Sequence, residues 1–328
     1  MRCDEPLISV VIPSLGQRRE LVDSIRSALS QDDPNYEALV VLNGVKGDEA
    51  KSLRTRFGED SRLGVIACDE QVDMAANYRR AYELAAGVLI KFLADDDLLL
   101  PGCLSTFRKA MTRYPLASIA SSTAQMVSTD GVVWGTDLGY GKEEMSYFKP
   151  EEAGPALLME RVPMGTPTHV MVRRRPDLNV EKMFASTNGS AFDTGLNFEC
   201  ASVGGMIKVN QALVAVRRHA SQASASIDEL VLFGNCQRIK SGALDYPNLR
   251  GLGLLPTDLL AGNALQYGLI SLQNRRLKNF MRLMSVMLCA PATLNALRYG
   301  GALAWSLQGR AYQRLKHKIR FGGIISTL

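Results

Sequence analysis

Val88-Leu89-Ile90-Lys91-Phe92-Leu93-Ala94-Asp95-Asp96-Asp97 is the stretch that decides the fold class of this chain. Its apolar part is typical of a buried strand, and three carboxylates follow at the strand's carboxyl end, where open α/β sheets bind ligands. Packed carboxylates repel one another and are costly to desolvate unless a cation holds them. Because Mg²⁺ usually bridges one or two carboxylates to substrate phosphates, the stretch favours a metal–diphosphate site. The alternative is a solvated acidic turn that caps a helix beginning near Pro101.

The segments before this stretch alternate between strand and helix patterns. Continuous apolar runs predict strands, and apolar residues at helical spacing predict helices between them. Alternation of this kind predicts a mostly parallel sheet with helices on both faces. The predicted strands are 7–12, 38–42 and 63–67, and the predicted helices are 21–29, 48–57 and 74–86, the last ended by Gly87.

The pattern changes after Tyr114. Thr129-Asp130-Gly131 is a hairpin signal between two strand-like runs, and from Ile227 onward the pattern is helical only. We therefore predict an α/β domain over residues 1–226 and a basic helical extension over 227–328. In the second half of the α/β domain the predicted strands are 117–127, 132–134, 168–172, 206–209 and 213–216, and the predicted helices are 143–159 and 191–203.

Charge is distributed unevenly along the chain. The net charge of the 328 residues is +5, but no Asp or Glu occurs from Leu259 to Leu328, where ten residues are basic. A basic tail on an acidic body predicts contact with an anionic surface. We expect that surface to be a membrane, because no nucleic-acid recognition motif accompanies the charge. The basic residues are Arg275, Arg276, Lys278, Arg282, Arg298, Arg310, Arg314, Lys316, Lys318 and Arg320.

Redox and targeting signals favour the cytoplasm. Six scattered cysteines without a CxxC unit argue against a zinc site or a disulfide framework. Acidic residues in Met1-Arg2-Cys3-Asp4-Glu5 stand where a secretory signal needs positive charge. The uncharged run 283–297 is too short for a membrane span and is interrupted by Pro291. We therefore expect a cytoplasmic protein that is peripheral on the inner face of the plasma membrane.

The common phosphate-binding signatures are absent, but a set of segments stands in a specific order. The chain has no GxxxxGK[ST] motif, and Gly251-Leu252-Gly253 lacks the third glycine and the preceding strand of a dinucleotide fingerprint. Over roughly residues 6–225 the order and spacing resemble the large family 2 group of glycosyltransferases with the GT-A fold. The segments are Pro13-Ser14-Leu15-Gly16, a helix with Asn77 and Arg80, Phe92 to Leu98, Gly165-Thr166-Pro167-Thr168, Phe192-Asp193, and Arg217-Arg218-His219 with the residues to Ser224.

The resemblance implies a Rossmann-like α/β fold with a defined site. Asp95 and Asp97 would hold Mg²⁺ or Mn²⁺ on the diphosphate of a nucleotide-sugar, with Asp97 the direct ligand, and His219 would complete the metal shell. Asp193 would act as the general base. The domain would divide into a nucleotide-sugar half, about 1–115, and an acceptor half, about 116–226. The implied substrate contacts are Pro13, Ser14, Leu15, Asn43, Asn77, Arg80, Asp95, Asp96, Thr166 and Arg218.

Two positions depart from the family pattern. Leu42 stands where an Asp usually precedes Asn43, which leaves recognition of the nucleotide base open. Phe192 stands before Asp193, where Glu or Trp is usual. The alternatives for single residues are His219 as a surface histidine beside two arginines, Asp193 as a helix N-cap, and Asn77 and Arg80 as solvated helix positions.

The chemistry of these residues supports a transfer reaction. A leaving nucleoside diphosphate gains negative charge, which a divalent cation stabilises, and a sugar hydroxyl needs a base within hydrogen-bond reach. We predict a metal-dependent inverting glycosyltransferase that moves a sugar from a UDP-, dTDP- or GDP-linked donor to a cell-surface glycan or lipid-linked acceptor. One alternative is a sugar-phosphate nucleotidyltransferase, although residues 13–19 lack its Gly-rich loop. The other is a catalytically silent sugar-nucleotide-binding membrane scaffold.

Overall fold

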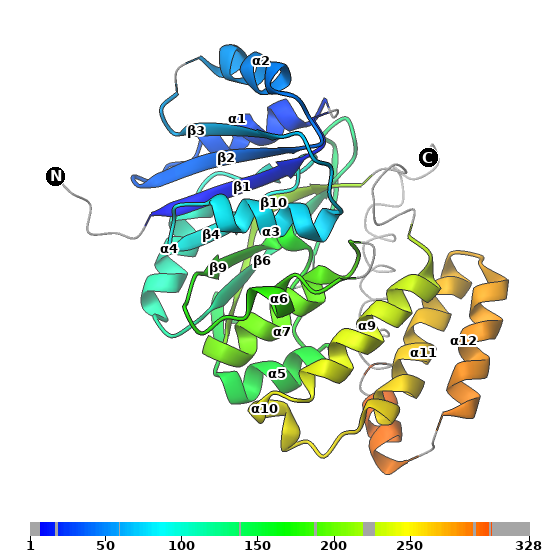
Figure 1. Ribbon diagram of the computed structural model, residues 1–328. Helices are drawn as coiled ribbons and strands as arrows, with labels where there is room; N and C mark the ends of the chain where they lie inside the picture. Colours follow the sequence, from blue (N-terminus) through cyan, green and yellow to red (C-terminus); the bar gives the residue numbers. More distant parts are fainter. Residues whose placement is uncertain are drawn as a thin grey trace. The chain divides into compact units, whose positions relative to one another are not determined.

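The computed structural model of the chain describes residues 7–16, 19–58, 60–137, 139–186, 189–218, 227–290, 293–301 and 303 (Figure 1). These residues form two compact units. The first comprises the described residues within Met1–Lys149 and Met164–His219, and the second those within Pro150–Pro163 and Ala220–Leu328. The predicted division at residue 226 stays a prediction, and Pro150–Pro163, expected in the acceptor half, groups with the helical unit.

A ten-stranded sheet forms the centre of the first unit, in the order β3-β2-β1-β4-β9-β6-β10-β5. Strands β1, β2, β3 and β4 are all parallel to one another. Strand β9 lies between β4 and β6 and is antiparallel to both. In addition, β7 pairs with β6 and β8 pairs with β10. The strands are β1 (Ile8–Ser14), β2 (Tyr36–Asn43), β3 (Leu63–Cys68), β4 (Leu89–Phe92), β5 (Leu98–Leu99), β6 (Ile119–Val127), β7 (Val133–Thr136), β8 (Met145–Phe148), β9 (Val170–Arg173) and β10 (Met206–Arg217).

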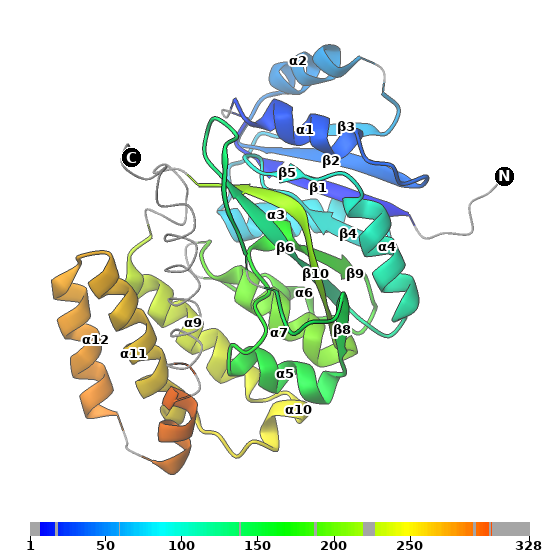
Figure 2. The same ribbon diagram turned by 180° about the vertical axis from the view of Figure 1, so that it is seen from behind.

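Helices cover both faces of this sheet. Figure 1 shows α3, α6 and α7 in front of it, and Figure 2 shows α1 and α4 on the opposite face. The α1 and α4 side holds a hydrophobic core that includes Ile25 and Phe107, and the other side holds a cluster of aromatic rings around Tyr78. The helices of this unit are α1 (Leu21–Leu29), α2 (Gly47–Phe57), α3 (Met74–Leu84), α4 (Cys103–Arg113), the 3-10 helix η1 (Pro167–His169), α6 (Val180–Met183) and α7 (Phe192–Gly204).

Pairing between distant strands overrides two sequence-based predictions. The predicted helix 143–159 is wrong over its first part, because Met145 and Tyr147 alternate onto the core as β8 pairs with β10. The helix α5 (Pro150–Leu158) begins only at the proline. The two short strands predicted at 206–209 and 213–216 are one strand, β10, with shifts in register against β6 between Lys208 and Val214. The hairpin around Thr129-Asp130-Gly131 is confirmed, since β6 and β7 pair across it.

The second unit contains only helices among its described regular elements, as predicted. Both views place α11 between α9 and α12 (Figures 1 and 2). Its interior contains a buried polar cluster, in which Lys240 Nζ donates to Glu160 Oε1 at 3.1 Å and to Asn263 Oδ1 at 3.2 Å. The Glu160 contact explains why Pro150–Pro163 groups with this unit. Its helices are α5, α9 (Glu229–Ala243), α10 (Pro247–Arg250), α11 (Pro256–Gln273) and α12 (Leu277–Cys289).

Across the described ranges, no helix is both long enough and apolar enough to cross a membrane.

Gly87 has a different role from the helix stop that its position suggested. The helix α3 already ends at Leu84, with Ala85 in extended backbone as its C-cap. Gly87 N–H donates to Ser9 Oγ at 2.8 Å, and a Cβ at Gly87 would lie 2.7 Å from Leu7 O and from Ser9 Oγ. The glycine therefore lets the α3–β4 connection approach β1 closely.

We predict that Gly87→Ala destabilises the protein by about 1–3 kcal/mol, because the added methyl group meets backbone that cannot yield without disturbing β1. Chemical denaturation of the two proteins measures the difference. Gly47→Ala is the matched control, since Gly47 begins α2 with open space around it. That change should be neutral or stabilise by up to about 1 kcal/mol. Equal stabilities of the Gly87 variant and wild type would contradict the close-approach role.

Candidate active site

Chain segments from four strands meet at one edge of the sheet. Ser14 ends β1, Asp95-Asp96-Asp97 follow β4, Arg217 ends β10, and Thr168 lies in η1, the turn that leads into β9. Because β9 is antiparallel to β4, its beginning lies at the edge where the other three strands end. This is the edge at which ligands bind in open α/β sheets.

Asp97 is the buried centre of this edge, at 3% exposure. Thr168 Oγ1 donates to its Oδ2 at 2.6 Å, and the Arg217 N–H donates to its Oδ1 at 3.0 Å. Burial first, and then the charge of Asp96, raises the pKa of the Asp97 carboxyl to about 7, against the opposing effect of these hydrogen bonds and of Arg218. The ionised carboxylate is therefore disfavoured unless positive charge comes close.

The two neighbouring aspartates are also held in place. Ser14 Oγ donates to Asp95 Oδ2 at 2.6 Å, and Arg217 Nη1 donates to the backbone carbonyl of Asp96 at 2.8 Å. The alternative of a capping turn is wrong, because Gly102 is the N-cap of α4 and no side chain caps that helix. The triple aspartate is a constrained loop.

Tyr78 connects these aspartates to Asp193. Its ring centroid lies 5.9 Å from that of Phe92, at the end of β4, and 4.8 Å from that of Phe192, at the start of α7. Burial raises the pKa of the Tyr78 hydroxyl well above its ordinary value, and the charges of all four aspartates raise it further. The fold therefore brings the triple aspartate and Asp193 around one tyrosine. No functional role was predicted for Tyr78, whose only signal in the sequence is its place beside Asn77.

Asp193 lies in the first turn of α7. Its Oδ1 accepts from the Thr194 N–H at 2.9 Å, and burial raises the pKa of its carboxyl. Ala191, with φ of 61°, occupies the N-cap position, so the alternative that Asp193 is the cap is wrong. A carboxyl group with a raised pKa is better suited to accept a proton than an ordinary aspartate.

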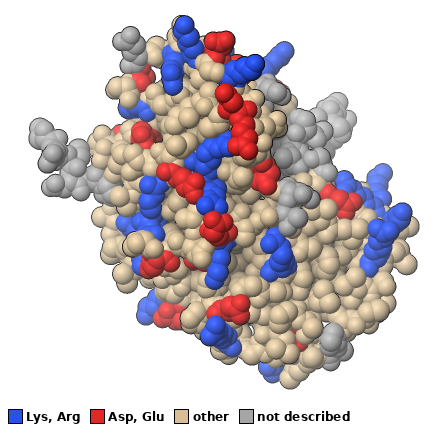
Figure 3. Space-filling view, viewed as in Figure 1, with Lys and Arg blue, Asp and Glu red and all other residues tan. Residues whose placement is uncertain are grey.

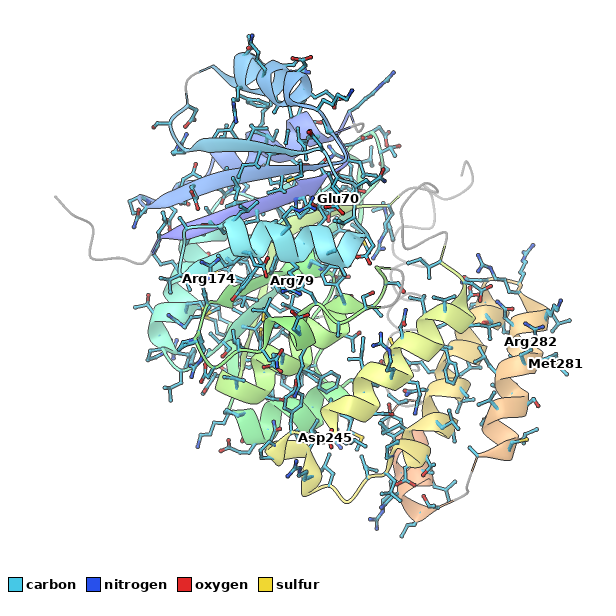
Figure 4. The ribbon with its side chains drawn as sticks, in the orientation of Figure 1. Glu70, Arg79, Arg174, Asp245, Met281 and Arg282 are labelled. Carbon is cyan, nitrogen blue, oxygen red and sulfur yellow. The ribbon has the colours of Figure 1, made fainter. Side chains whose placement is uncertain are left out.

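Asn43 and Asn77 are both buried. The Asn43 amide donates to Val72 O at 2.8 Å and accepts from Val72 N at 2.9 Å, so it holds the loop between β3 and α3. Asn77 is 4% exposed, which rules out a solvated position, and its Oδ1 has no hydrogen-bond partner among the described residues. Arg80 Nη1 donates at 3.4 Å to the backbone carbonyl of Glu70, which precedes α3 in the chain and is labelled in Figure 4.

The remaining predicted residues differ in their surroundings. His219 lies outside the described residues. Thr166 caps η1, and Arg218 is exposed close enough to Asp97 to affect its pKa. Pro13 is buried in β1 and Leu15 is exposed directly after it. Within the described part of the chain, no three His, Cys, Asp or Glu side chains are grouped to hold a metal ion.

A buried histidine–aspartate pair beside the site was missed by the sequence analysis. His169 Nδ1 accepts the Thr166 N–H at 3.0 Å, so its Nε2 carries the proton and donates to Asp137 Oδ2 at 2.6 Å. Burial first, with Lys208 and Lys91, lowers the pKa of His169 against the opposing charge of Asp137. The pair also explains Gly165 (φ 78°), because a Cβ there would lie 2.3 Å from the His169 ring.

Comparison with known proteins identifies the chain. The family model described as Glycosyl transferase family 2 matches residues 9–180, just over half of the sequence. The chain belongs to glycosyl transferase family 2. The predicted family is therefore confirmed.

The fold of this family 2 chain is similar to solved structures. The crystal structure of S. aureus TarS 1-349 in complex with UDP-GlcNAc aligns with a TM-score of 0.58 at 12% identity, over 96% of this chain and 92% of that one. A second TarS 1-349 structure, in complex with UDP, aligns with a TM-score of 0.54 at 15% identity, over 96% and 91%. At these identities the likeness shows the fold, and it confirms the predicted GT-A-type α/β architecture.

Curated relatives of this family 2 chain match over shorter stretches. The uncharacterized protein MT1568 of Mycobacterium tuberculosis is 29% identical over 52% of this chain and 54% of its own length. The putative teichuronic acid biosynthesis glycosyltransferase TuaG of Bacillus subtilis is 29% identical over 28% of this chain and 37% of its own. WfgD of Escherichia coli, named as a UDP-Glc:alpha-D-GlcNAc-diphosphoundecaprenol beta-1,3-glucosyltransferase, is 31% identical over 29% and 37%. The chain thus spans about half, or less, of the length of these relatives.

We predict that His169→Asn destabilises the protein by about 1–3 kcal/mol near pH 7.5 and by less near pH 5.5. The pKa of His169 is lower in the folded than in the unfolded chain, so the unfolded chain binds a proton first as the pH falls below about 6.5, and wild-type stability decreases there. Protonation would place an N–H on Nδ1 against the Thr166 N–H donor. Asparagine does not titrate, so the difference in unfolding free energy between the variant and wild type, measured by denaturation, should be smaller at pH 5.5 than at pH 7.5. A difference that stays constant with pH would contradict the neutral tautomer.

Proposed function

We propose that this family 2 chain is a metal-dependent inverting glycosyltransferase, which moves a sugar from a nucleotide-diphosphate-sugar to a hydroxyl of a glycan or lipid-linked acceptor. The observation that carries the proposal is that Asp95-Asp96-Asp97 and Asp193 come close to one residue, Tyr78, whose ring packs against Phe92 before the triple aspartate and against Phe192 before Asp193. These carboxylates come from two different elements, the loop after β4 and the first turn of α7. One group can therefore serve the leaving diphosphate while the other serves the attacking hydroxyl.

The residues after β4 suit a divalent cation. Asp97 is buried beside Asp96 with a raised pKa, and a cation would favour its ionised form. Asp95 and Asp97, with His219, would hold Mg²⁺ or Mn²⁺, both of which take oxygen ligands. The bound ion supplies positive charge for the leaving diphosphate. Arg218 adds a second positive charge near the same carboxylates.

The nucleotide part of the donor fits the loops after β1 and β3 and the helix α3. Ser14 and Leu15 follow β1, and Asn43 holds the β3–α3 loop through Val72. The Asn77 Oδ1 is a buried acceptor for which a ligand N–H or O–H would provide the missing hydrogen bond. Structural neighbours described in complex with UDP-GlcNAc and UDP support a UDP-linked donor. Because Leu42 stands in place of the usual acid, this position has no carboxylate to hydrogen-bond the nucleotide base.

Asp193 is the proposed base. Its carboxyl has a pKa raised by burial and lies in a helix turn beside Tyr78, separate from the diphosphate carboxylates. Asp193 would remove the proton of the acceptor hydroxyl as its oxygen bonds to the anomeric carbon and the bond from that carbon to the diphosphate oxygen breaks, so that the nucleoside diphosphate leaves directly. A single displacement inverts the configuration.

The acceptor proposal draws on the relatives. WfgD and a Campylobacter jejuni relative, named as a GalNAc(5)-diNAcBac-PP-undecaprenol beta-1,3-glucosyltransferase, carry the names of enzymes that act on diphosphate-linked undecaprenol. We infer a lipid-linked acceptor of the same chemical class, and a cytoplasmic protein peripheral on the inner membrane face. Family membership disfavours a nucleotidyltransferase. One assay separates the proposed enzyme from a silent scaffold. Purified protein incubated with Mn²⁺ and UDP-sugars would release UDP if it is the enzyme and none if it is a scaffold.

We predict that Asp97→Ala abolishes transfer and weakens nucleoside diphosphate binding far more with Mn²⁺ than without it, because the change removes a metal ligand but few direct donor contacts. Calorimetric titration of UDP with and without Mn²⁺ measures this. His219→Ala should cause a smaller loss, since water can replace a neutral ligand. Asp245→Ala, at an exposed aspartate of the helical unit (Figure 4), is the matched control and should behave as wild type. Wild-type transfer by the Asp97 variant would sink the metal assignment.

We predict that Asp193→Asn lowers transfer by roughly 10²–10⁴-fold while donor affinity stays nearly unchanged, because the isosteric amide cannot accept the proton. Steady-state rates together with UDP titration separate the two effects. If donor affinity collapsed along with the rate, Asp193 would be a donor contact or a structural residue and not the base.

A further inference from the structure

The helix α12 exposes apolar and basic side chains on one side. Leu277, Met281 and Leu288 are 62%, 60% and 78% exposed, and the spacing of four and seven residues places them on a common stripe. Lys278 and Arg282 are exposed next to the first two. We call these five residues the α12 outer face. Figure 4 shows Met281 and Arg282 projecting from α12 away from α11.

The opposite side of α12 is packed within its own unit. Leu283, on the side of the helix opposite Met281, is fully buried. Met284 lies at the edge of the stripe, where its side chain contacts Gly268 of α11. The apolar side chains of the outer face therefore remain exposed although α12 already packs against its own unit through other residues. A stripe of large exposed apolar side chains on a single helix marks an interaction site.

The charges around this face are mostly positive. The nearest acids, Asp228 and Glu229, begin α9 and are engaged by neighbouring side chains, since Glu229 Oε2 accepts from Arg276 Nη1 at 3.0 Å and Asp228 Oδ2 from Asn279 Nδ2 at 3.1 Å. Arg282 lies close enough to Asp228 to contribute to the lowered pKa of that carboxyl. Within the described residues, no ion pair holds Lys278 or Arg282. Figure 3 shows basic side chains along this edge of the helical unit, around the α11–α12 turn and α12.

We propose that the α12 outer face docks on an anionic lipid surface. A helix that lies in the membrane interface buries an apolar stripe at the boundary of headgroups and acyl chains, while Lys and Arg beside the stripe contact lipid phosphates. Leu277, Met281 and Leu288 supply the stripe, and Lys278 and Arg282 supply the cations. A second copy of the chain is a poorer occupant, because symmetric pairing of this face would bring its own cations together. The proposed lipid-linked acceptor gives the docking its purpose, and the binding itself is independent of catalysis.

The experiment is co-sedimentation of the full chain with vesicles of phosphatidylcholine alone or mixed with phosphatidylglycerol. Wild type should sediment with the mixed vesicles at low salt, stay soluble with phosphatidylcholine alone, and be released as salt rises. Lys278→Gln with Arg282→Gln should weaken partitioning roughly 30-fold, at about tenfold per 1.4 kcal/mol and about 1 kcal/mol per cation. Met281→Gln with Leu288→Gln should weaken it at least tenfold.

Matched controls place the same changes on exposed residues of the other unit. Leu116 is 68% exposed, and Lys51 and Arg56 are exposed on α2, so Leu116→Gln and Lys51→Gln with Arg56→Gln should bind vesicles as wild type does. Equal losses in controls and α12 variants, or wild type remaining in the supernatant with mixed vesicles at low salt, would overturn the proposal. A dimer in sedimentation velocity that Met281→Gln dissolves would assign the face to a second copy and overturn it too. Transfer to a soluble acceptor without vesicles tests the enzyme separately, so loss of one activity with the other intact shows which proposal has failed.

Discussion

The buried carboxylate of Asp97 is the constraint on which the site depends. Placing a carboxylate inside a protein is costly unless hydrogen bonds and charges compensate it. Here the Thr168 hydroxyl donates to Asp97 and accepts the Ala94 N–H at 3.0 Å, while the backbone of Arg217 donates from the end of β10. Ser24 of α1 donates to the Asp97 carbonyl at 2.7 Å. Three segments that are distant in the sequence, at Ser24, Thr168 and Arg217, thus converge on Asp97.

Two lysines are buried in the sheet near the site, Lys91 in β4 and Lys208 in β10. Lys91 of β4 donates to the Phe92 and Thr168 carbonyls, and Lys208 of β10 donates to the Ser122 carbonyl at 2.9 Å. Burial lowers the pKa of each lysine to about 8, and nearby aspartates oppose that shift. Lys91 lies close enough to Asp97 for the two charges to attract, and both lysines add to the effect of burial that lowers the pKa of His169.

Aromatic packing sets where the proposed base stands relative to the proposed metal ligands. The rings of Tyr78, Phe92 and Phe192 join α3, β4 and α7, and Phe184 packs against both Phe92 and Phe192. Such ring contacts add to the apolar area they bury and favour defined geometries. Phe192, the departure from the usual residue before the base, is therefore a structural member of the site. Its ring couples the first turn of α7 to the strand that carries the aspartates.

The sequence by itself determined the features that neighbouring residues encode. The alternation of strands and helices, the aspartates at a strand end, the Thr129-Asp130-Gly131 hairpin and the helical carboxyl-terminal part all follow from local periodicity and turn chemistry. The ordered segments also led to the correct family, and they pointed to Asp95, Asp97 and Asp193 as the acids to examine. Local signals were sufficient for these features because the residues that form each element also carry the sequence pattern that predicts it.

Only the tertiary structure decided the features that depend on pairing and burial. Residues 145–148 became a strand because β10 lies beside them, and Gly87 proved to be a point of close approach and not a helix stop. The His169–Asp137 pair joins positions far apart in the chain, and the raised pKa of Asp97 arises from burial beside Asp96. The exposed stripe of α12 could be separated from its packed side only once α11 was in place. Desolvation and long-range contacts are properties of the packed chain, and no window of sequence contains them.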